Sequence, residues 1–382
     1  MKKQRIEKTI KIMKEAKLDG LLFATGANLQ YLLDCTDYFW QRTCMNNIMG
    51  HSNYRNVPET VLYVKASGEY YIFTVPHLQK TFSCYPNVII TYMDQLEDSM
   101  SPYIEGNSIG VGFACFDYLK DALHGIDDQI QITEAEDLLN DIRCIKDTDE
   151  IATLRKMAEF TDEAIRHVLA NLRLGMSQYE AEQAVMQYGL DHGISDLSFP
   201  PTCGIKTRMT ELAKDALSFD RNTPLVNNTA IALDIGFMHD GYCSDWGRTV
   251  YYGQAPELVK KGYHALQAGQ QHMVASIVPY KTNVNELYGF VLEKVTELGY
   301  GAYLRFQEKG NLGHQIGIDC HEHPMLNKEV DYILKPGMVF CSEPKMFFEN
   351  ECYMRVEDMV LVTETGAEFL TKFDRNLFEL PL

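Results

Sequence analysis

Two acidic residues stand close together in the stretch IALDIGFMHDGYCSDWGRTV, residues 231–250. Asp234 ends an apolar run, and Asp245 follows the Asp-Gly pair at 240–241, which is a strong hairpin signal between apolar segments. A turn centred between residues 239 and 240 places Asp234 directly opposite Asp245. Because like charges that face each other destabilise a sheet, this arrangement predicts that a cation lies between the two carboxylates.

A second pair of strands repeats the pattern. The apolar segment MVFCSE ends in Glu343, the segment MRVEDMVLV carries Glu357, and a turn around Asn350 places the two glutamates opposite each other. Glu357 and Asp358 are adjacent and take opposite faces of a regular strand, so one of the two acids points inward. An inward carboxylate needs a partner, which again indicates a bound cation.

His314 lies between the two hairpins in GNLGHQIGIDCHEHP, residues 310–324, among glycines that let the backbone approach closely. One imidazole and four carboxylates form an oxygen-rich ligand set, which suits hard or borderline divalent metals. Four carboxylates are too many for one divalent ion, so the set predicts two ions with bridging carboxylates. Such a site commonly holds a bridging hydroxide that is nucleophilic at neutral pH. The residues alone therefore predict a two-metal hydrolase.

The elements that must position these residues fall into two parts. The first part combines a helix at about 3–17 with strands, which is an α/β pattern. The segment 34–55 is rich in aromatic residues and shows no hydrophobic periodicity, which predicts a long loop. The strands predicted in this part are 20–24, 60–64, 70–74, 88–91 and 109–112.

The second part begins near residue 146, where we place the domain boundary. From there, pairs of helices alternate with strand-rich acidic blocks at 229–252 and 312–363. Four helices are predicted, at about 149–172, after Ser177, at 255–277 and after Asn283. All of them except the helix at 255–277 open with a capping-box pattern. The three patterns are Asp147 with Glu150, Ser177 with Glu180, and Asn283 with Glu286.

Composition limits the classes of function. The 382 residues predict two domains. The formal net charge of −18 argues against nucleic acid and anionic membranes as partners. Ten cysteines without CxxC pairs indicate neither a zinc ribbon nor a disulfide scaffold, and they favour a reducing, cytoplasmic setting. The charged N-terminus has no apolar signal core, and no run is long enough to span a bilayer.

Four motifs, LDIG…GYCSDWGRT, GHQIGIDCHEHP, FCSEP and MRVEDMVLVTETG, resemble in order and spacing the superfamily of Xaa-Pro aminopeptidases, prolidases, methionine aminopeptidases and creatinases. The resemblance covers about 150–375, and KLDGLLFATGANLQYL is similar to the creatinase-type N-terminal domain. It implies an α/β creatinase-like N-terminal domain, residues 1–146, and an α+β catalytic domain of the pita-bread fold, residues 147–382.

The resemblance also implies roles for individual residues. It makes Asp234, Asp245, His314, Glu343 and Glu357 the ligands of two divalent ions, which are manganese, cobalt, zinc or iron. Asp245 and Glu357 would bridge the ions, and Glu343 would also act as the acid–base group. His321 would contact the substrate and the tetrahedral intermediate, and Arg355 would pair with a ligating carboxylate and fix its geometry.

This sequence departs from the family pattern around the substrate. Peptidases of the family have a histidine about 17 residues before the first ligand, where this chain has residues 217–219, LSF. The proline-specific enzymes have another histidine four residues before the metal histidine, and Gly310 stands there. The family's glycine after the Glu-Pro pair is replaced by Lys345. The segment between Gly204 and Asp234 is also several residues longer than is usual.

The leading prediction is an Xaa-Pro aminopeptidase or dipeptidase that assembles as a homodimer. One alternative is a non-peptidase hydrolase or lyase of the same fold that acts on a small C–N or C–S compound. Another is a non-catalytic binding protein, against which the complete ligand set argues, since proteins of that kind lose ligands first.

Several single residues can be interpreted either as structural residues or as residues of the active site. Lys345 is either a solvated strand-end lysine or a group that binds a substrate carboxylate or lowers the local negative charge. Trp40 belongs either to loop packing or, as in relatives with this domain, to the active site of a neighbouring subunit. His321 reaches the site only if the backbone is irregular, His323 is interpreted as a loop residue and His239 as solvent-exposed.

Overall fold

The computed structural model describes residues 2–35, 57–206, 221–348 and 352–380. The chain forms two compact units, residues 1–143 and 144–382. Each unit has its own hydrophobic core, so each is described by itself.

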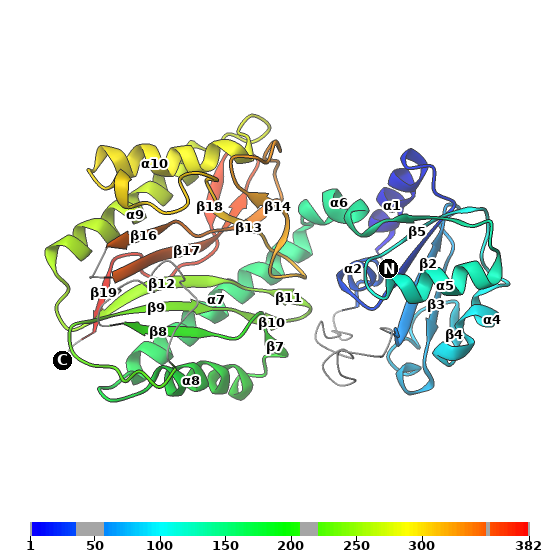
Figure 1. The fold of residues 1–382 in the computed structure, drawn as a ribbon, viewed down its shortest axis with the longest axis horizontal. Helices are drawn as coiled ribbons and strands as arrows, with labels where there is room; N and C mark the ends of the chain where they lie inside the picture. Colours follow the sequence, from blue (N-terminus) through cyan, green and yellow to red (C-terminus); the bar gives the residue numbers. More distant parts are fainter. Residues whose placement is uncertain (1, 36–56, 207–220, 349–351, 381–382) are drawn as a thin grey trace. The chain divides into compact units, whose positions relative to one another are not determined.

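The first unit is built on a six-stranded mixed sheet in the order β4-β3-β2-β1-β5-β6 (Figure 1). β1 runs antiparallel to β2 and parallel to β5, and the apolar residues of these strands pack against α4 and α5. The bounds of the strands are β1 Gly20–Ala24, β2 Thr60–Lys65, β3 Tyr70–Thr74, β4 Val88–Ile90, β5 Ser108–Val111 and β6 Gln131–Glu134. The helices are α1 Lys3–Glu15, α2 Ala27–Leu33, α4 Leu96–Met100, α5 Phe116–Ile126 and α6 Asn140–Cys144. The strands predicted from the sequence are confirmed within one residue at each end.

The second unit has a ten-stranded sheet whose main path is β14-β13-β15-β17-β12-β9-β8. A small sheet, β11-β10-β7, extends one end of the hairpin that β9 and β12 form. The strands of the main path are β8 Thr202–Lys206, β9 Thr229–Ile235, β12 Trp246–Tyr252, β13 Gly313–Gln315, β14 Glu322–Leu326, β15 Val339–Ser342 and β17 Cys352–Val362. The remaining strands are β7 Asp196–Leu197, β10 Phe237–His239, β11 Tyr242–Cys243, β16 Lys345–Phe348, β18 Ala367–Phe369 and β19 Phe378–Leu380.

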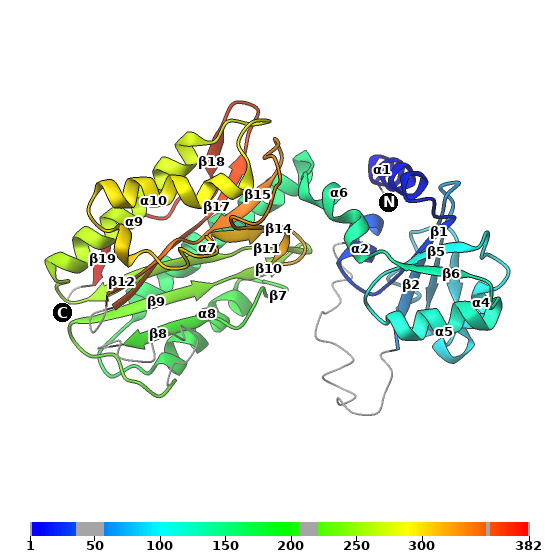
Figure 2. The same cartoon turned by 45° about the horizontal axis from the view of Figure 1, so that its top comes forward.

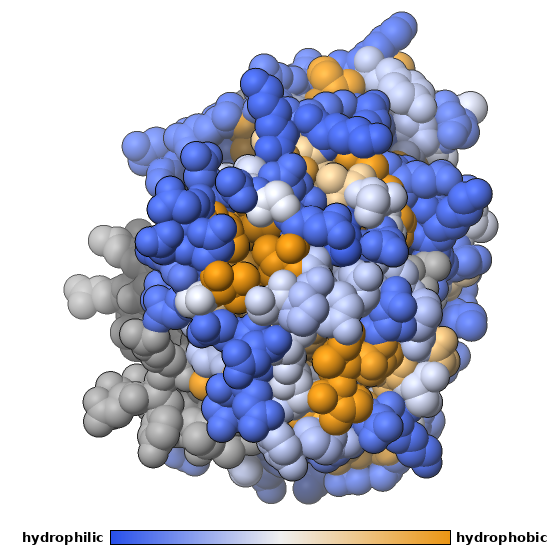
Figure 3. Space-filling view, turned by 90° about the vertical axis from the view of Figure 1, so that its right-hand side faces the viewer, coloured by the Kyte–Doolittle hydropathy of each residue, from blue (hydrophilic) through white to orange (hydrophobic). Residues whose placement is uncertain are grey.

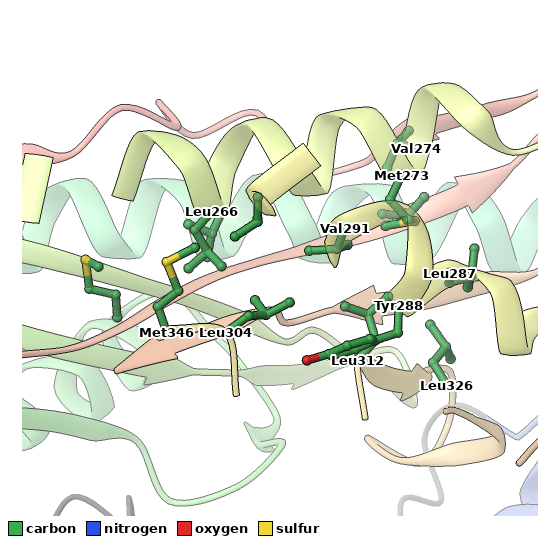
Figure 4. Packing of buried hydrophobic residues seen from close by; sticks show 14 of the residues in the cluster. Leu266, Met273, Val274, Leu287, Tyr288, Val291, Leu304, Leu312, Leu326 and Met346 are labelled. Carbon is green, nitrogen blue, oxygen red and sulfur yellow. The ribbon is translucent and has the colours of Figure 1, made fainter. Parts of the chain in front are cut away.

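Two pairs of helices cover this sheet, each over its own half. α7 Thr148–Asn171 and α8 Gln178–Asp191 pack on β8, β9 and β12, while α9 Glu257–Ser276 and α10 Leu287–Glu297 pack on the half that contains β13, β15 and β17 (Figures 1 and 2). The second contact is made by leucine, valine and methionine side chains that interdigitate between helix and strand (Figure 4). The four-helix prediction and the grouping of helix pairs with strand blocks are confirmed.

The helix starts follow the local sequence. All three predicted capping boxes form, with the side chains of Asp147, Ser177 and Asn283 each accepting a backbone hydrogen bond in the first turn. The third box opens a short 3₁₀ turn, Val284–Glu286, which leads directly into α10. These reciprocal bonds satisfy N–H groups that a helix start otherwise leaves without partners.

The predicted register of the first hairpin is wrong by two residues. Asp234 pairs with Gly247, and His239 pairs with Tyr242, so the turn centres on Asp240-Gly241. Both central residues have a positive φ, 49° and 77°, as the tight turn that favours Asp-Gly requires. Asp245 then lies opposite residue 236 and diagonally from Asp234, on the same face of the sheet.

The register of the second hairpin is confirmed. Ser342 pairs with Asp358 on one side of the two glutamates, and Lys345 pairs with Arg355 on the other. Both ladders have the register in which residue 343 stands opposite residue 357. The turn itself, around residue 350, lies outside the described residues.

The face drawn in Figure 3 is mainly hydrophilic, with hydrophobic residues in small separate patches. Within the described part of the chain, no helix combines the length and the apolar character that crossing a membrane requires.

Candidate metal centre

Five strands that are neighbours in the sheet bring the predicted ligands together. The path β13-β15-β17-β12-β9 carries His314 on β13, Glu343 directly after β15, Glu357 on β17, Asp245 directly before β12 and Asp234 on β9. Because adjacent strands lie about 5 Å apart, residues at matching heights on one face form a compact cluster. The structure therefore collects all five predicted ligands in one region of the sheet.

The cluster has a deep part and an accessible part. The side chains of Asp245, His314 and Glu357 are at most 5% exposed, whereas those of Asp234 and Glu343 are 26% and 20% exposed. The Nε2 atom of His314 lies 3.4 Å from Oδ2 of Asp245. The other ring nitrogen, Nδ1, lies 3.0 Å from the carbonyl oxygen of Gln315, which fixes the orientation of the ring.

Arg355 joins three of the acids from one side. Its guanidinium group contacts Asp234 and lies 3.4 Å from Glu357 and 3.7 Å from Glu343. Gly247 makes room for this arrangement, since a Cβ atom there would stand 2.4 Å from Cδ of Arg355 and 2.6 Å from Oε2 of Glu357. The guanidinium group of Arg355 thus lies against the acidic cluster.

Lys345 also lies at the cluster. Its Nζ atom forms an ion pair with Oε2 of Glu343, and its side chain is mostly buried. Lys345 is thus not a solvated lysine at the end of a strand. Of the two interpretations that the sequence left open, the contact favours the one in which the ammonium group interacts with the site.

Burial and mutual repulsion control the protonation of the acids. Burial, together with the charge of Asp245, raises the pKa of Glu357 well above its usual range, and burial also raises the pKa of Asp234 against the opposing effect of Arg355. Burial acts on Glu343 in the same direction, but the charges of Lys345 and Arg355 outweigh it and lower its pKa. The two neighbouring cations therefore favour the ionised form of Glu343.

The donor set fits divalent metal ions. Oδ1 of Asp245 and Oε2 of Glu357 are buried and, within the described part of the chain, accept no hydrogen bond. Buried carboxylate oxygens of this kind need either a proton or a cation. Donor atoms of Asp245, His314, Cys341 and Glu357 all lie within 4.8 Å of one another, which is a separation that one ion can bridge.

His321 reaches the site because the backbone is irregular. The register between β13 and β14 shifts between His314 and Gln315, and His321 lies just before β14. The rings of His314 and His321 meet edge to face with centroids 3.9 Å apart. Burial and the neighbouring His314 lower the pKa of His321, which favours its neutral form.

A buried ion pair holds this irregular segment. Glu322 pairs with Nζ of Lys146 at 3.0 Å and accepts a hydrogen bond from the backbone N–H of Asp319. Gly317 provides the space, because a Cβ atom at that position would lie within 3 Å of the Glu322 carboxylate. His321 is therefore positioned by its neighbour in the sequence.

Two cysteines at the site were not among the predicted ligands. Cys341 lies within the deep cluster, and Sγ of Cys320 lies 3.4 Å from Oδ2 of Asp245. Cys341 stands two residues before Glu343 and so shares its strand face, a period that could have indicated it. Cys320 depends on the irregular segment and carries no such signal.

The opposite face of the sheet holds a second charged cluster. Asp358 is fully buried and pairs with Arg248 at 2.5 Å and with Arg375 at 3.4 Å. Arg248 also donates a hydrogen bond to the carbonyl oxygen of Glu357. Glu357 and Asp358 thus take opposite faces as predicted, but both are buried.

The remaining predictions have mixed outcomes. His239 has a side chain that is 44% exposed, as expected. His323 was interpreted as a loop residue, which is wrong, because it lies in β14 with its side chain exposed. Trp40 and residues 217–219 lie outside the described residues.

Comparisons with known proteins agree with this geometry. The family model for metallopeptidase family M24 matches residues 152–364, and the model for the creatinase/prolidase N-terminal domain matches residues 5–145. An uncharacterized peptidase of Bacillus subtilis is 30% identical over 242 residues, which cover 63% of this chain and 65% of that relative. An Xaa-Pro dipeptidase of Pyrococcus furiosus is 25% identical over 383 residues, covering 98% of this chain and 99% of the relative.

A solved structure, of a dipeptidase from Pyrococcus horikoshii, has a TM-score of 0.82 and 23% identity, and it covers 98% of this chain and 100% of that one. This likeness shows that the two chains share their fold. The α/β N-terminal domain and the α+β catalytic domain expected from the sequence are confirmed.

Proposed function

The chain belongs to metallopeptidase family M24, and from this premise we propose that it is a metal-dependent Xaa-Pro dipeptidase. The substrate class comes from the relatives that carry this name along their whole length. The observation that carries the proposal is the collection of Asp234, Asp245, His314, Glu343 and Glu357 from five neighbouring strands, with deep oxygens that accept no hydrogen bond from the described residues.

We propose that these five residues hold two divalent ions. Asp245 and Glu357, the deep carboxylates, would hold the ions from the buried side of the cluster. Asp234, His314 and Glu343 would complete the ligand set. When bound, the ions polarise the scissile carbonyl group and make water a nucleophile at neutral pH.

The protein's own residues then handle protons and orientation. Glu343, whose pKa the nearby Lys345 and Arg355 lower, accepts the proton of the attacking water and passes it to the leaving amine. His321 lies beside His314, and in its neutral form it donates a hydrogen bond to the developing oxyanion. Arg355 holds Asp234 and Glu357 in place and thereby positions the ligands.

Several finer features belong to the same proposal. We take manganese as the first metal to test and a homodimer as the assembly, with Trp40 reaching the substrate. The second unit, residues 144–382, carries the chemistry, and the first unit, residues 1–143, forms the accessory domain. The described cysteines are free thiols, which supports a reducing, cytoplasmic setting, and the charge of −18 supports the expectation that nucleic acid and membranes are not partners.

The test is hydrolysis of Xaa-Pro dipeptides, Xaa-Pro tripeptides and matched Xaa-Ala dipeptides by protein loaded with manganese. We expect turnover of the Xaa-Pro dipeptides that falls by at least about 10³-fold in Glu343→Gln. The control variant Glu368→Gln changes an exposed acid that pairs with Arg155 and keeps wild-type activity. Metal content, measured by mass spectrometry on each protein, shows whether an inactive variant still holds its ions.

Absence of peptide turnover in the wild-type protein with two ions bound would overturn the proposal. The candidate that would then replace it is a hydrolase or lyase of the same fold that acts on a small C–N or C–S compound. Turnover that survives in Glu343→Gln would instead overturn the role given to this residue.

A further inference from the structure

We propose that Lys345 receives the free C-terminal carboxylate of the substrate and thereby selects dipeptides over longer or blocked peptides. This inference rests on the proposed function and assigns to it a residue for substrate length. It starts from the ion pair between Lys345 and Glu343.

The position of Lys345 is fixed by its strand. It is the first residue of β16, its Cα atom pairs with that of Arg355 in β17, and its carbonyl oxygen accepts a hydrogen bond of 2.9 Å from the N–H of Arg305. The ammonium group lies 5.7 Å from the centre of the Phe306 ring, which is partly exposed. The backbone of Lys345 is therefore anchored, while its long stem lets the ammonium group move.

The accessible side of the cluster is the side where Lys345 lies. Asp234 and Glu343 have the exposed side chains of the ligand set, whereas Asp245, His314 and Glu357 are buried. A substrate must approach from the exposed side, since the other acids are closed off by protein. Lys345, in contact with Glu343, is thus at the place where substrate enters.

Metal binding changes the charge balance of the site. Without metal, four carboxyl groups face two cations, Arg355 and Lys345. Two divalent ions balance the four carboxylates, so the charges of Arg355 and Lys345 then remain in excess. A surplus of positive charge in a poorly solvated site favours an anionic ligand.

The two cations differ in their freedom to bind that ligand. Arg355 contacts Asp234 and lies close to both Glu343 and Glu357, so its guanidinium group stays engaged with several ligands. Among the described residues, Lys345 forms one ion pair, with Glu343. When metal is bound, this carboxylate would coordinate the metal instead. Lys345 is therefore the cation that metal binding releases toward the substrate.

The reach of a dipeptide matches this position. In an Xaa-Pro dipeptide the carboxylate is attached to the residue whose nitrogen leaves, so it lies within about 4 Å of the scissile carbonyl carbon. Each further residue carries the carboxylate up to about 3.5 Å farther away. A cation beside Glu343, the group that serves the scissile bond, therefore fits the carboxylate of a dipeptide better than that of a longer peptide.

The test compares a free and a neutralised carboxylate in two measurements. The first is the ratio of kcat/KM for Ala-Pro and for Ala-Pro amide. The second is the affinity of the manganese-loaded protein for L-proline and for L-prolinamide, measured by calorimetry. The proteins are wild type, Lys345→Met, Lys345→Arg and the control Lys294→Met, which removes an ammonium group that pairs with Glu297 on α10.

We expect wild type and Lys294→Met to prefer the free carboxylate by about 30-fold or more in both measurements. Lys345→Met should lose most of this preference, mainly through KM, while it keeps two bound ions. Lys345→Arg, which retains the positive charge, should keep the preference within about fivefold of wild type.

An unchanged preference in Lys345→Met overturns the proposal. The proposal is also overturned if Lys345→Met lowers kcat/KM equally for both peptides and loses bound metal. Lys345 would then serve only to balance the charge of Glu343. If the wild type hydrolyses neither peptide, the proposed function fails, but the proline and prolinamide titrations still decide whether Lys345 binds a carboxylate.

Discussion

Glu357 and Asp358 are adjacent acids of β17 that are both buried and face opposite sides of one sheet. On its side, Asp358 meets two guanidinium groups, those of Arg248 and Arg375. On the other side, Glu357 shares a single guanidinium group, that of Arg355, with the carboxylates of Asp234 and Glu343.

The two faces therefore satisfy the same chemical need in different ways. A buried carboxylate is stable when nearby cations compensate it, and it stays a site for a proton or a metal when they do not. The face of Asp358, here called the compensated face, stabilises the fold through its two arginines. On the face of Glu357 the carboxyl groups outnumber the cations, so this face remains available for a ligand. Substitutions that remove one acid from each face test this distinction.

The largest effect is expected from Glu357→Gln. Turnover should fall by roughly 10⁴-fold, about 5 kcal/mol of transition-state stabilisation, because the amide cannot bridge two cations. The free energy of unfolding of the metal-free protein should change by less than about 1 kcal/mol, since burial raises the pKa of Glu357 and favours the neutral carboxyl, which the amide resembles. Turnover of an Xaa-Pro dipeptide by metal-loaded protein and urea unfolding in the presence of a chelator measure the two quantities, and the metal content of each protein is determined alongside.

Stabilisation by added metal is the accompanying control for Glu357→Gln. Wild-type protein at a metal concentration 100 times the Kd gains about 2.7 kcal/mol, and the variant should gain much less. A variant that is destabilised without metal, or that still takes up two ions, would show that Glu357 belongs to the structural face instead.

Asp358→Asn should have the opposite profile. It leaves the buried Arg248 and the half-buried Arg375 without their carboxylate and should lower the free energy of unfolding by about 3–5 kcal/mol. This loss should be the same with chelator and with metal, because Asp358 points away from the candidate metal centre. A variant whose loss disappears on addition of metal would contradict the separation of the two faces.

The smallest effect concerns a second acid of the compensated face. Burial raises the pKa of Asp162 to about 6, from a usual value of 3.8, against the opposing effects of a backbone hydrogen bond from Lys372 and the charge of Arg248. Between these values the folded protein keeps a proton that the unfolded chain has lost. The contribution of this carboxyl to stability is thus full below about pH 4 and is lost as the pH rises through about 6.

Asp162→Asn should therefore be more stable than wild type at pH 7.5 by roughly 1–3 kcal/mol and nearly equal to it at pH 4. The asparagine side chain can still accept the hydrogen bond that the N–H of Lys372 donates. Urea unfolding at both pH values gives the difference, with Glu159→Gln, an exposed acid that pairs with Lys372, as the control. An equal difference at the two pH values would mean that the carboxyl does not change its charge.

Local sequence signals predicted much of this fold. The capping boxes at Asp147, Ser177 and Asn283 and the strands of the first unit depend on neighbours in the sequence, and they form as expected. The second hairpin has its predicted register because its apolar strands fix the pairing. The first was predicted two residues out of register, because the turn was centred before Asp240 although both Asp240 and Gly241 adopt a positive φ.

Features that depend on irregular backbone or on the direction of a side chain could not be predicted from the sequence. His321 approaches His314 only through the register shift between β13 and β14, which no periodic pattern contains. Lys345 was left with several interpretations because the choice depends on where a flexible ammonium group points. The arginines that compensate Asp358 come from residues 248 and 375, and a sequence alone does not show that these meet.

The ion pair of Lys146 with Glu322 has a consequence for how this protein could be recombined with others. Lys146 stands within three residues of the boundary between the two units, yet its ammonium group and its backbone N–H, which bonds to Gly337, belong to the second unit. A gene fusion that joins a foreign N-terminal domain at residue 147 would discard this lysine and release the segment that carries His321. A fusion that is meant to keep the site intact therefore has to begin before Lys146.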